Sequence, residues 1–168
     1  TRTWSMAWST PPLCGRMPVL RGREKNGGQA GQALGRSRGG FSTKIHVTVD
    51  GLGNPLRFRL TGGQQHDVTL ADEMIADLPF DYVIADRGYA AHDFRSQILA
   101  RGAQPIIPPK KNARNPHDYD TWLYRERHLV ECFIGKIKHF RRVFSRFDKL
   151  ASRYLAFLHL TGSLIWLR

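Results

Sequence analysis

Apolar and polar side chains alternate along two neighbouring stretches of the chain. Residues 41–49 alternate, and residues 55–60 alternate again. Between them, Asp50, Gly51 and Asn54 provide the residue types that favour a tight turn. Because strict alternation indicates a strand with one buried face, the two stretches predict a β-hairpin.

After the hairpin, the apolar pattern predicts helices and short strands in alternation. The expected elements are a helix over 67–78 with Asp67 as its N-cap, a buried strand over 82–85, a helix over 91–100, a strand over 104–107 stopped by Pro108 and Pro109, a long helix after a polar loop, and a buried terminal helix over 154–167. This order predicts an α/β fold.

The long helix has two distinct faces. At about 100° of rotation per residue, one polar stripe within roughly 60° holds Tyr124, Arg127, Glu131 and Lys138. The apolar set recurs at steps of three and four and points elsewhere: Val130, Phe133, Ile137, Phe140 and Phe144. A carboxylate among hydroxyl and cationic donors suits chemistry on phosphate. A solvated face with i, i+4 ion pairs such as Arg127 with Glu131 explains the same stripe.

A second carboxylate, Asp86, follows a short buried strand and precedes a turn at Gly88. Open α/β sheets carry their active sites at the carboxyl ends of such strands. Taken alone, Asp86 is equally consistent with a turn residue.

The charge balance indicates a polyanionic partner. The 168 residues include 26 Lys and Arg against 14 Asp and Glu, which gives a net charge of +12 and a pI near 10.4. Much of the positive charge lies in Lys110, Lys111, the run 136–146 and the Arg-rich start. No apolar run reaches the roughly 18–20 residues of a membrane span. Two cysteines are too few for a disulfide framework, so we expect a reducing cytoplasm.

Asp86 and the Tyr-x2-Arg-x3-Glu-x6-Lys pattern together resemble the second and third carboxylates of the DDE insertion-sequence transposases, specifically the insertion sequence 5 group. The resemblance covers the chain from about Gly35 to Arg168. Further matching stretches are the Gly35–Gly40 loop leading into Thr43-Lys-Ile-His46, then Gly53-Asn-Pro-Leu56, His66-Asp67 and Ile107-Pro-Pro109. The resemblance implies a ribonuclease H-like mixed sheet flanked by helices, and metal-dependent cleavage and transfer of DNA strands.

The resemblance also implies roles for individual residues. Asp86 and Glu131 become catalytic ligands of Mg²⁺, and Tyr124, Arg127 and Lys138 position DNA near the scissile phosphate. Further DNA contacts are expected from Lys110, Lys111, Arg141 and Arg142, and from Arg36 and Arg38 unless these two only flank a flexible entry to the hairpin. The partners implied are transposon ends and target DNA in the cytoplasm, at the nucleoid, and a homo-oligomer is compatible with the full-length enzyme.

Residues 1–34 differ from the rest, and we separate them as an arm from a partial catalytic domain over 35–168. Residues 1–26 show neither helical nor strand periodicity, so composition predicts a disordered arm. In the resembled family, this is where the strand with the first catalytic Asp belongs. No Asp precedes Asp50. The sheet is therefore expected to lack its first catalytic strand, and a two-metal site with two of its three carboxylates would be weak.

The adjacent reading frame offers an explanation for the missing residue. The codons of residues 8–14 permit Val-Asp-Ser-Thr-Ile-Val in that frame, with the Asp read across Ser9 and Thr10. Arg23 to Asn26 can be encoded by an A-rich run, where polymerases and ribosomes slip. We hypothesise that the chain is the downstream frame of a frameshifted transposase gene, by programmed slippage or by decay. The alternatives are an unrelated basic arm and, for function, a non-catalytic DNA-binding remnant.

The nucleotide sequence tests this hypothesis. We expect the adjacent frame to encode Val-Asp-Ser-Thr-Ile-Val over Trp8 to Cys14, with an A-run near Lys25. Stop codons or unrelated residues in that frame would end the frameshift account.

Overall fold

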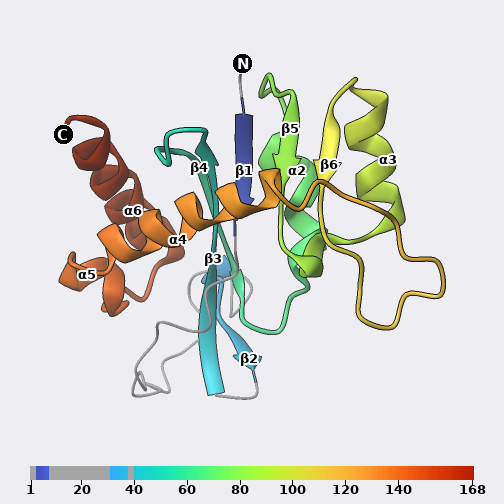
Figure 1. Cartoon of the computed structure of the whole chain (residues 1–168). Helices are drawn as coiled ribbons and strands as arrows, with labels where there is room; N and C mark the ends of the chain where they lie inside the picture. Colours follow the sequence, from blue (N-terminus) through green and yellow to red (C-terminus); the bar gives the residue numbers. More distant parts are fainter. Residues whose placement is uncertain (1–2, 8–30, 38–39) are drawn as a thin grey trace. The chain divides into compact units, whose positions relative to one another are not determined.

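A mixed sheet organises the chain (Figure 1). The structure is a computed structural model and describes residues 3–7, 31–37 and 40–168. The strands are β1 (Thr3–Ala7), β2 (Gly35–Ser37), β3 (Gly40–Asp50), β4 (Pro55–Gly62), β5 (Tyr82–Ile84) and β6 (Gln104–Ile106), in the order β2-β3-β1-β5-β6, and β4 also pairs with β3. Strand β1 is antiparallel to β3, whereas β1, β5 and β6 are mutually parallel. The expected α/β class is confirmed.

The predicted hairpin is present as β3 and β4. Its turn is closed by Asp50, whose Oδ1 accepts hydrogen bonds from the backbone N–H groups of Leu52 at 2.9 Å and Asn54 at 2.8 Å. The Asp50 N–H also donates to the Asn54 carbonyl at 2.9 Å. A side chain that mimics a backbone turn is the reason Asp is favoured here.

Strand β1 corrects the expectation that residues 1–26 contain no strand. Ser5 lies opposite Val49 of β3 and opposite Ile84 of β5, so β1 occupies the centre of the sheet (Figure 1). Ladder pairing uses backbone groups, and the facing edges of β3 and β5 would otherwise leave their N–H and C=O groups without partners. Residues Thr3–Ala7 therefore form a strand although their sequence shows no strand periodicity. Residues 8–30 lie outside the described part of the chain.

Segment 35–40, expected as a loop, is also partly a strand. Gly35 of β2 pairs with Ser42 of β3, and Ser37 pairs with Gly40. Arg36 is exposed on β2, and Arg38 lies outside the described residues.

The chain divides into two compact units, which we describe separately. The first comprises residues 1–8, 47–57 and 66–133, and the second comprises 9–46, 58–65 and 134–168. Strands β3 and β4 and helix α4 (His128–Ile137) contribute residues to both.

The first unit has a core beneath β5. Its short helices are η1 (Asp67–Leu70), α2 (Ala71–Ile75), η2 (Arg87–Tyr89), α3 (His92–Ala100) and η3 (Leu123–Arg127). Its core cluster includes Met74, Ile75, Val83, Tyr89, Phe94 and Ile98, all at most 2% exposed. The predicted helix over 91–100 and the strands on either side of it are confirmed to within two residues.

The predicted helix over 67–78 is shorter and less regular than expected. It begins as a 3-10 turn and ends at Ile75. Asp77 has φ of 59°, a left-handed conformation that stops the helix. Asp67 is not the N-cap, which is His66, without a side-chain capping bond.

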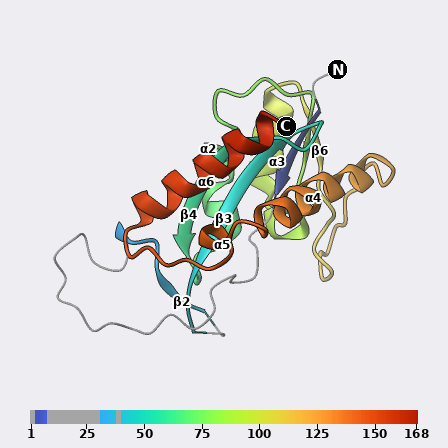
Figure 2. The same cartoon turned by 90° about the vertical axis from the view of Figure 1, so that its left-hand side faces the viewer.

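The second unit contains α5 (Arg141–Phe144) and α6 (Ala151–Trp166). Helix α6 lies beside β4, where the His159 ring meets the Phe58 ring edge-on at 5.4 Å between centroids (Figure 2). Tyr154 and Leu158 are buried, but Leu160 is 56% exposed. The expectation of a buried terminal helix is therefore only half right, because one face of α6 packs and the other meets solvent.

A buried arginine joins distant segments of the second unit. Arg146 is 4% exposed, and its guanidinium donates to the carbonyls of Gln32 at 2.7 Å and Lys149 at 2.9 Å, and to Thr43 Oγ1. It also lies 5.4 Å from the Tyr154 ring centroid. Arg146 belongs to the basic run 136–146, yet its donors are used inside the protein.

Candidate active site

Asp86 lies where the sequence predicts, directly after β5. It is half-buried, and its Oδ1 accepts a hydrogen bond from the backbone N–H of Gly88 at 2.8 Å. A Cβ atom at Gly88 would lie 2.9 Å from Asp86 Oδ1 and 3.3 Å from Asp67 Oδ2. Glycine at 88 therefore allows the backbone to approach two carboxylates closely, and the turn fixes the Asp86 side chain.

Asp67 is a neighbour of Asp86 that the sequence did not place there. Both carboxylates raise the pKa of the buried Tyr89 phenol, although burial itself is the larger cause. The Tyr89 phenol is therefore neutral, and it is buried close to the two carboxylates. In the sequence, His66-Asp67 is one of the stretches that match the resembled family, and we interpreted Asp67 as a helix cap rather than as half of a catalytic pair.

Tyr124, Arg127 and Glu131 are brought together at the junction of η3 and α4. The Arg127 guanidinium donates to Glu131 Oε1 at 2.6 Å, and its carbon lies 5.8 Å from the Tyr124 ring centroid. The Arg127 side chain is 20% exposed and that of Glu131 is 50% exposed. This is the predicted i, i+4 pair, and the Arg127 end of it is largely shielded from solvent.

Tyr124 connects this group to Asp86. Burial raises the pKa of the Tyr124 phenol, the Arg127 guanidinium lowers it, and Asp86 raises it further. The Tyr119 ring meets the Tyr124 ring edge-on at 5.5 Å. The phenol thus lies within electrostatic range of both the strand-end carboxylate and the helix guanidinium.

The continuous helix expected through Phe144 is interrupted. Tyr124 and Arg127 lie in the 3-10 helix η3, α4 ends at Ile137, and Phe140 has an extended conformation with φ −88° and ψ 104° before α5. The apolar period is reset there, so Phe144 is 47% exposed rather than buried. Lys138 is exposed just beyond α4 and belongs to the second unit, whereas Tyr124, Arg127 and Glu131 belong to the first.

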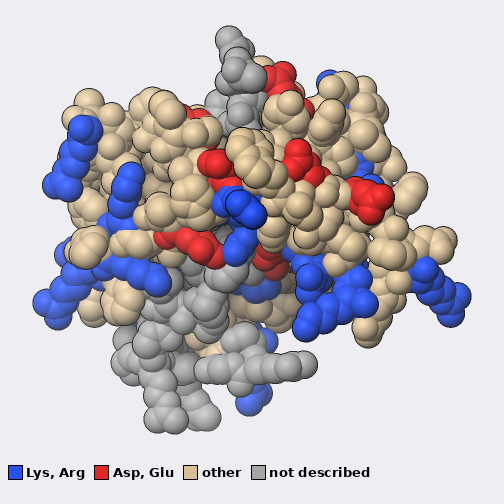
Figure 3. All heavy atoms as spheres, viewed as in Figure 1, with Lys and Arg blue, Asp and Glu red and all other residues tan. Residues whose placement is uncertain are grey.

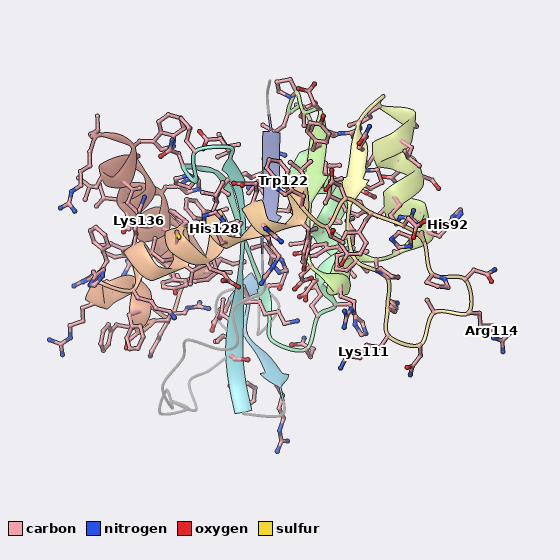
Figure 4. The ribbon with its side chains drawn as sticks, in the orientation of Figure 1. His92, Lys111, Arg114, Trp122, His128 and Lys136 are labelled. Carbon is pink, nitrogen blue, oxygen red and sulfur yellow. The ribbon has the colours of Figure 1, made fainter. Side chains whose placement is uncertain are left out.

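The basic residues expected to contact DNA in the loop after β6 and on α5 are solvent-accessible. Lys110 and Lys111 are exposed in the loop after β6, from which Lys111 and Arg114 project (Figure 4). Arg141 and Arg142 are exposed on α5, where Lys and Arg atoms gather in Figure 3. Each is therefore available to a polyanion.

The described carboxylates only partly fit a metal ion. Within the described residues, no three His, Cys, Asp or Glu side chains are close enough together to hold a metal. Asp86 and Glu131 offer the oxygen donors that hard divalent cations take, but they amount to two ligands.

Among the residues that the structure describes, no helix is long and apolar enough to cross a membrane.

Comparison with known families identifies the chain. The model of the transposase DDE domain family matches residues 17–118. The chain belongs to this family. The match includes Asp86, ends before Glu131, and begins inside segment 1–34, whose boundary with the catalytic domain stays a prediction.

Named relatives agree with this assignment. A protein of Brucella ovis named as a transposase for insertion sequence element IS6501 is 37% identical over 132 residues, which cover 76% of this chain and 100% of the relative. A protein of Burkholderia cepacia named as a transposase for element IS402 is 31% identical over 135 residues, 73% of this chain and 62% of the relative. No solved structure gives a significant match. The resemblance to insertion-sequence transposases is confirmed, and family membership implies DNA as partner and a divalent metal as cofactor.

Proposed function

We propose that the chain is a partial catalytic domain of an insertion-sequence transposase, acting at the nucleoid on transposon ends and target DNA. In this proposal its sheet is ribonuclease H-like, with β1 as the central strand. Asp86 and Glu131 are its second and third carboxylates, and Tyr124, Arg127 and Lys138 position the DNA.

The observation that carries the proposal is the cluster of Tyr124, Arg127 and Glu131 in the same unit as Asp86. The Arg127 guanidinium donates to Glu131 Oε1 at 2.6 Å, and its carbon lies 5.8 Å from the Tyr124 ring centroid. All four residues lie in the first unit. The Arg127 side chain is only 20% exposed and contacts both a carboxylate and an aromatic ring, so the arrangement favours a site over a solvated ion pair.

Metal chemistry in this proposal depends on ligands that the described residues supply incompletely. Asp86 and Glu131 would hold Mg²⁺ together with a third carboxylate. When bound, the metal stabilises the charge that develops on the oxygens of the scissile phosphate. The chain's own residues bind and orient the phosphate: Arg127 and Lys138 supply positive charge, and Tyr124 supplies a neutral hydroxyl donor.

The frameshift account places the third carboxylate shortly after β1, which is paired with the strand that precedes Asp86. Ser5 is paired with Ile84, so Ala7 and Asp86 each lie two residues beyond that pair. The next residues, Trp8 to Thr10, are those whose codons permit Val-Asp in the adjacent frame. Carboxyl ends of parallel strands meet at one edge of a sheet. We infer that the present chain binds DNA but lacks the carboxylate that completes its catalytic set.

DNA binding should be electrostatic and largely independent of sequence. Affinity for duplex DNA should fall log-linearly with salt concentration, with a slope of about 0.9 per neutralised phosphate. Lys138→Ala should weaken binding and lower the slope, whereas Arg168→Ala, at the exposed end of the chain, should do neither. Fluorescence anisotropy titrations at several salt concentrations measure both quantities. A flat salt response would exclude a phosphate backbone as the partner.

A further inference from the structure

A cavity in the second unit lies outside the residues assigned to cleavage. Its volume is about 420 Å³, and it is lined by Arg141, Arg142, Phe147 and Asp148. Small-molecule sites in proteins begin at about 300 Å³, so the cavity has room for one flat ring system. It lies where α5 passes into the turn before α6.

Two arginines and one exposed aromatic ring line this cavity, and each arginine lies against a phenylalanine ring. The Arg141 guanidinium lies 5.8 Å from the Phe147 ring centroid, and Arg142 lies 4.8 Å from that of Phe157. Phe147 is 58% exposed. A phenylalanine this exposed stabilises the fold little, whereas stacking on a nucleobase would bury its face. Aromatic rings beside a positive groove are the recurring means of binding single-stranded nucleic acid.

Asp148 distinguishes a base from a phosphate as the occupant of the cavity. Its carboxylate would repel a phosphate placed inside. Asp148 Oδ2 is buried and makes no hydrogen bond within the described residues. Nucleobases carry N–H donors on their edges, and Asp and Glu accept from them. The cavity therefore suits a base, and the exposed guanidiniums at its rim suit the flanking phosphates.

We propose that Arg141, Arg142, Phe147 and Asp148 form an unpaired-base site that binds single-stranded DNA. Phe147 stacks on one base that is not in a duplex, and Arg141 and Arg142 contact the phosphates on either side. The proposal rests on the proposed function only in taking DNA as the partner, and it assigns this surface to the unpaired strand. Duplex DNA, whose bases are already stacked, would use the arginines alone.

The test compares three fluorescent probes of equal length: a mixed-sequence single strand, an abasic single strand with the same number of phosphates, and a duplex. Phe147→Ala in the full chain should weaken binding of the base-containing single strand by roughly tenfold. It should change binding of the abasic strand and the duplex by less than about twofold, since neither offers an unstacked base. Phe147→Trp should retain or improve single-strand binding, because indole stacks at least as well.

Phe144→Ala is the matched control. Phe144 is an exposed ring at the end of α5, three residues before Phe147, but it does not line the cavity. It should leave all three affinities unchanged. Equal losses on all probes, or no loss with Phe147→Ala, would overturn the unpaired-base site while the salt-dependent duplex binding still stands. Absence of salt-dependent binding to every probe would instead refute the proposed function.

Photocrosslinking tests the site without any substitution. A single strand containing 5-bromodeoxyuridine, irradiated with the unaltered chain, should crosslink to the segment that holds Phe147, as mapped by peptide mass spectrometry. Crosslinks confined to other segments would contradict the proposal, even if Phe147→Ala failed to fold.

Discussion

Replacing either Asp86 or Glu131 by Ala in a frame-restored chain should reduce cleavage of transposon-end DNA by about a thousandfold or more. In the frame-restored chain, the segment before the A-rich run is translated in the adjacent reading frame. Metal ligands stabilise charge that develops only in the transition state, and several kcal/mol of such stabilisation corresponds to this factor. DNA affinity should stay within about threefold, because ground-state phosphate binding relies on the cations. Cleavage of labelled end fragments with Mg²⁺ or Mn²⁺ and anisotropy titrations measure the two effects separately.

Controls make this result specific to the two carboxylates. Asp93→Ala removes a carboxylate that is 98% exposed on α3, and it should leave cleavage unchanged. The chain without frame restoration should cleave little. If it cleaves strongly, a carboxylate already present completes the site, and Asp67 beside Gly88 is the first to substitute. Undiminished cleavage by Glu131→Ala would exclude Glu131 from the catalytic set.

The fold was predictable where local sequence determines local structure. The β3–β4 hairpin follows from alternation and from the Asp50 turn, and α3 ends before Gly102, whose φ is 76°. Such elements carry their own signals in a few adjacent residues. Strand β1 has no such signal, because its position is fixed by the two edges of β3 and β5 that it joins.

The spacing predicted the contact between Arg127 and Glu131, whereas the expected helix geometry was wrong. Arg127 and Glu131 do pair, and the Tyr124 ring lies beside the Arg127 guanidinium, yet the expected single helix is divided into η3, α4 and α5. An ideal 100° rotation fails once 3-10 turns and an extended residue intervene. Asp67 could not be placed from sequence, because its approach to Gly88 is a tertiary contact.

Charge alone also misled the interpretation of the basic run 136–146. Arg142 is exposed, whereas Arg146 is 4% exposed and hydrogen-bonded inside the second unit. A count of basic residues cannot distinguish a cation that faces solvent from one that joins buried carbonyls. Residues 141–147 interleave arginine with Phe144 and Phe147, and this alternation is the sequence signal for the proposed unpaired-base site.

Arg146→Ala should lower the free energy of unfolding by about 3 kcal/mol or more, because hydrogen bonds from a charged donor contribute about 1.5–3 kcal/mol each. The Gln32 and Lys149 carbonyls and Thr43 Oγ1 would each lose the donor that Arg146 supplies. Arg146→Lys should restore little, since an ammonium cannot reach acceptors on opposite sides as a planar guanidinium does.

Arg153→Ala is the control for Arg146, because Arg153 is exposed on α6 and carries the same charge. The free energy of unfolding of this variant should differ from that of the unaltered chain by no more than about 0.5 kcal/mol. Urea unfolding followed by circular dichroism gives both values, provided that the free energy of unfolding falls with urea concentration at the same slope in both variants. DNA titrations below the unfolding transition should show equal, small losses for the two variants. If Arg146→Ala were as stable as the unaltered chain but bound DNA far more weakly, its guanidinium would contact phosphate rather than join segments of the protein.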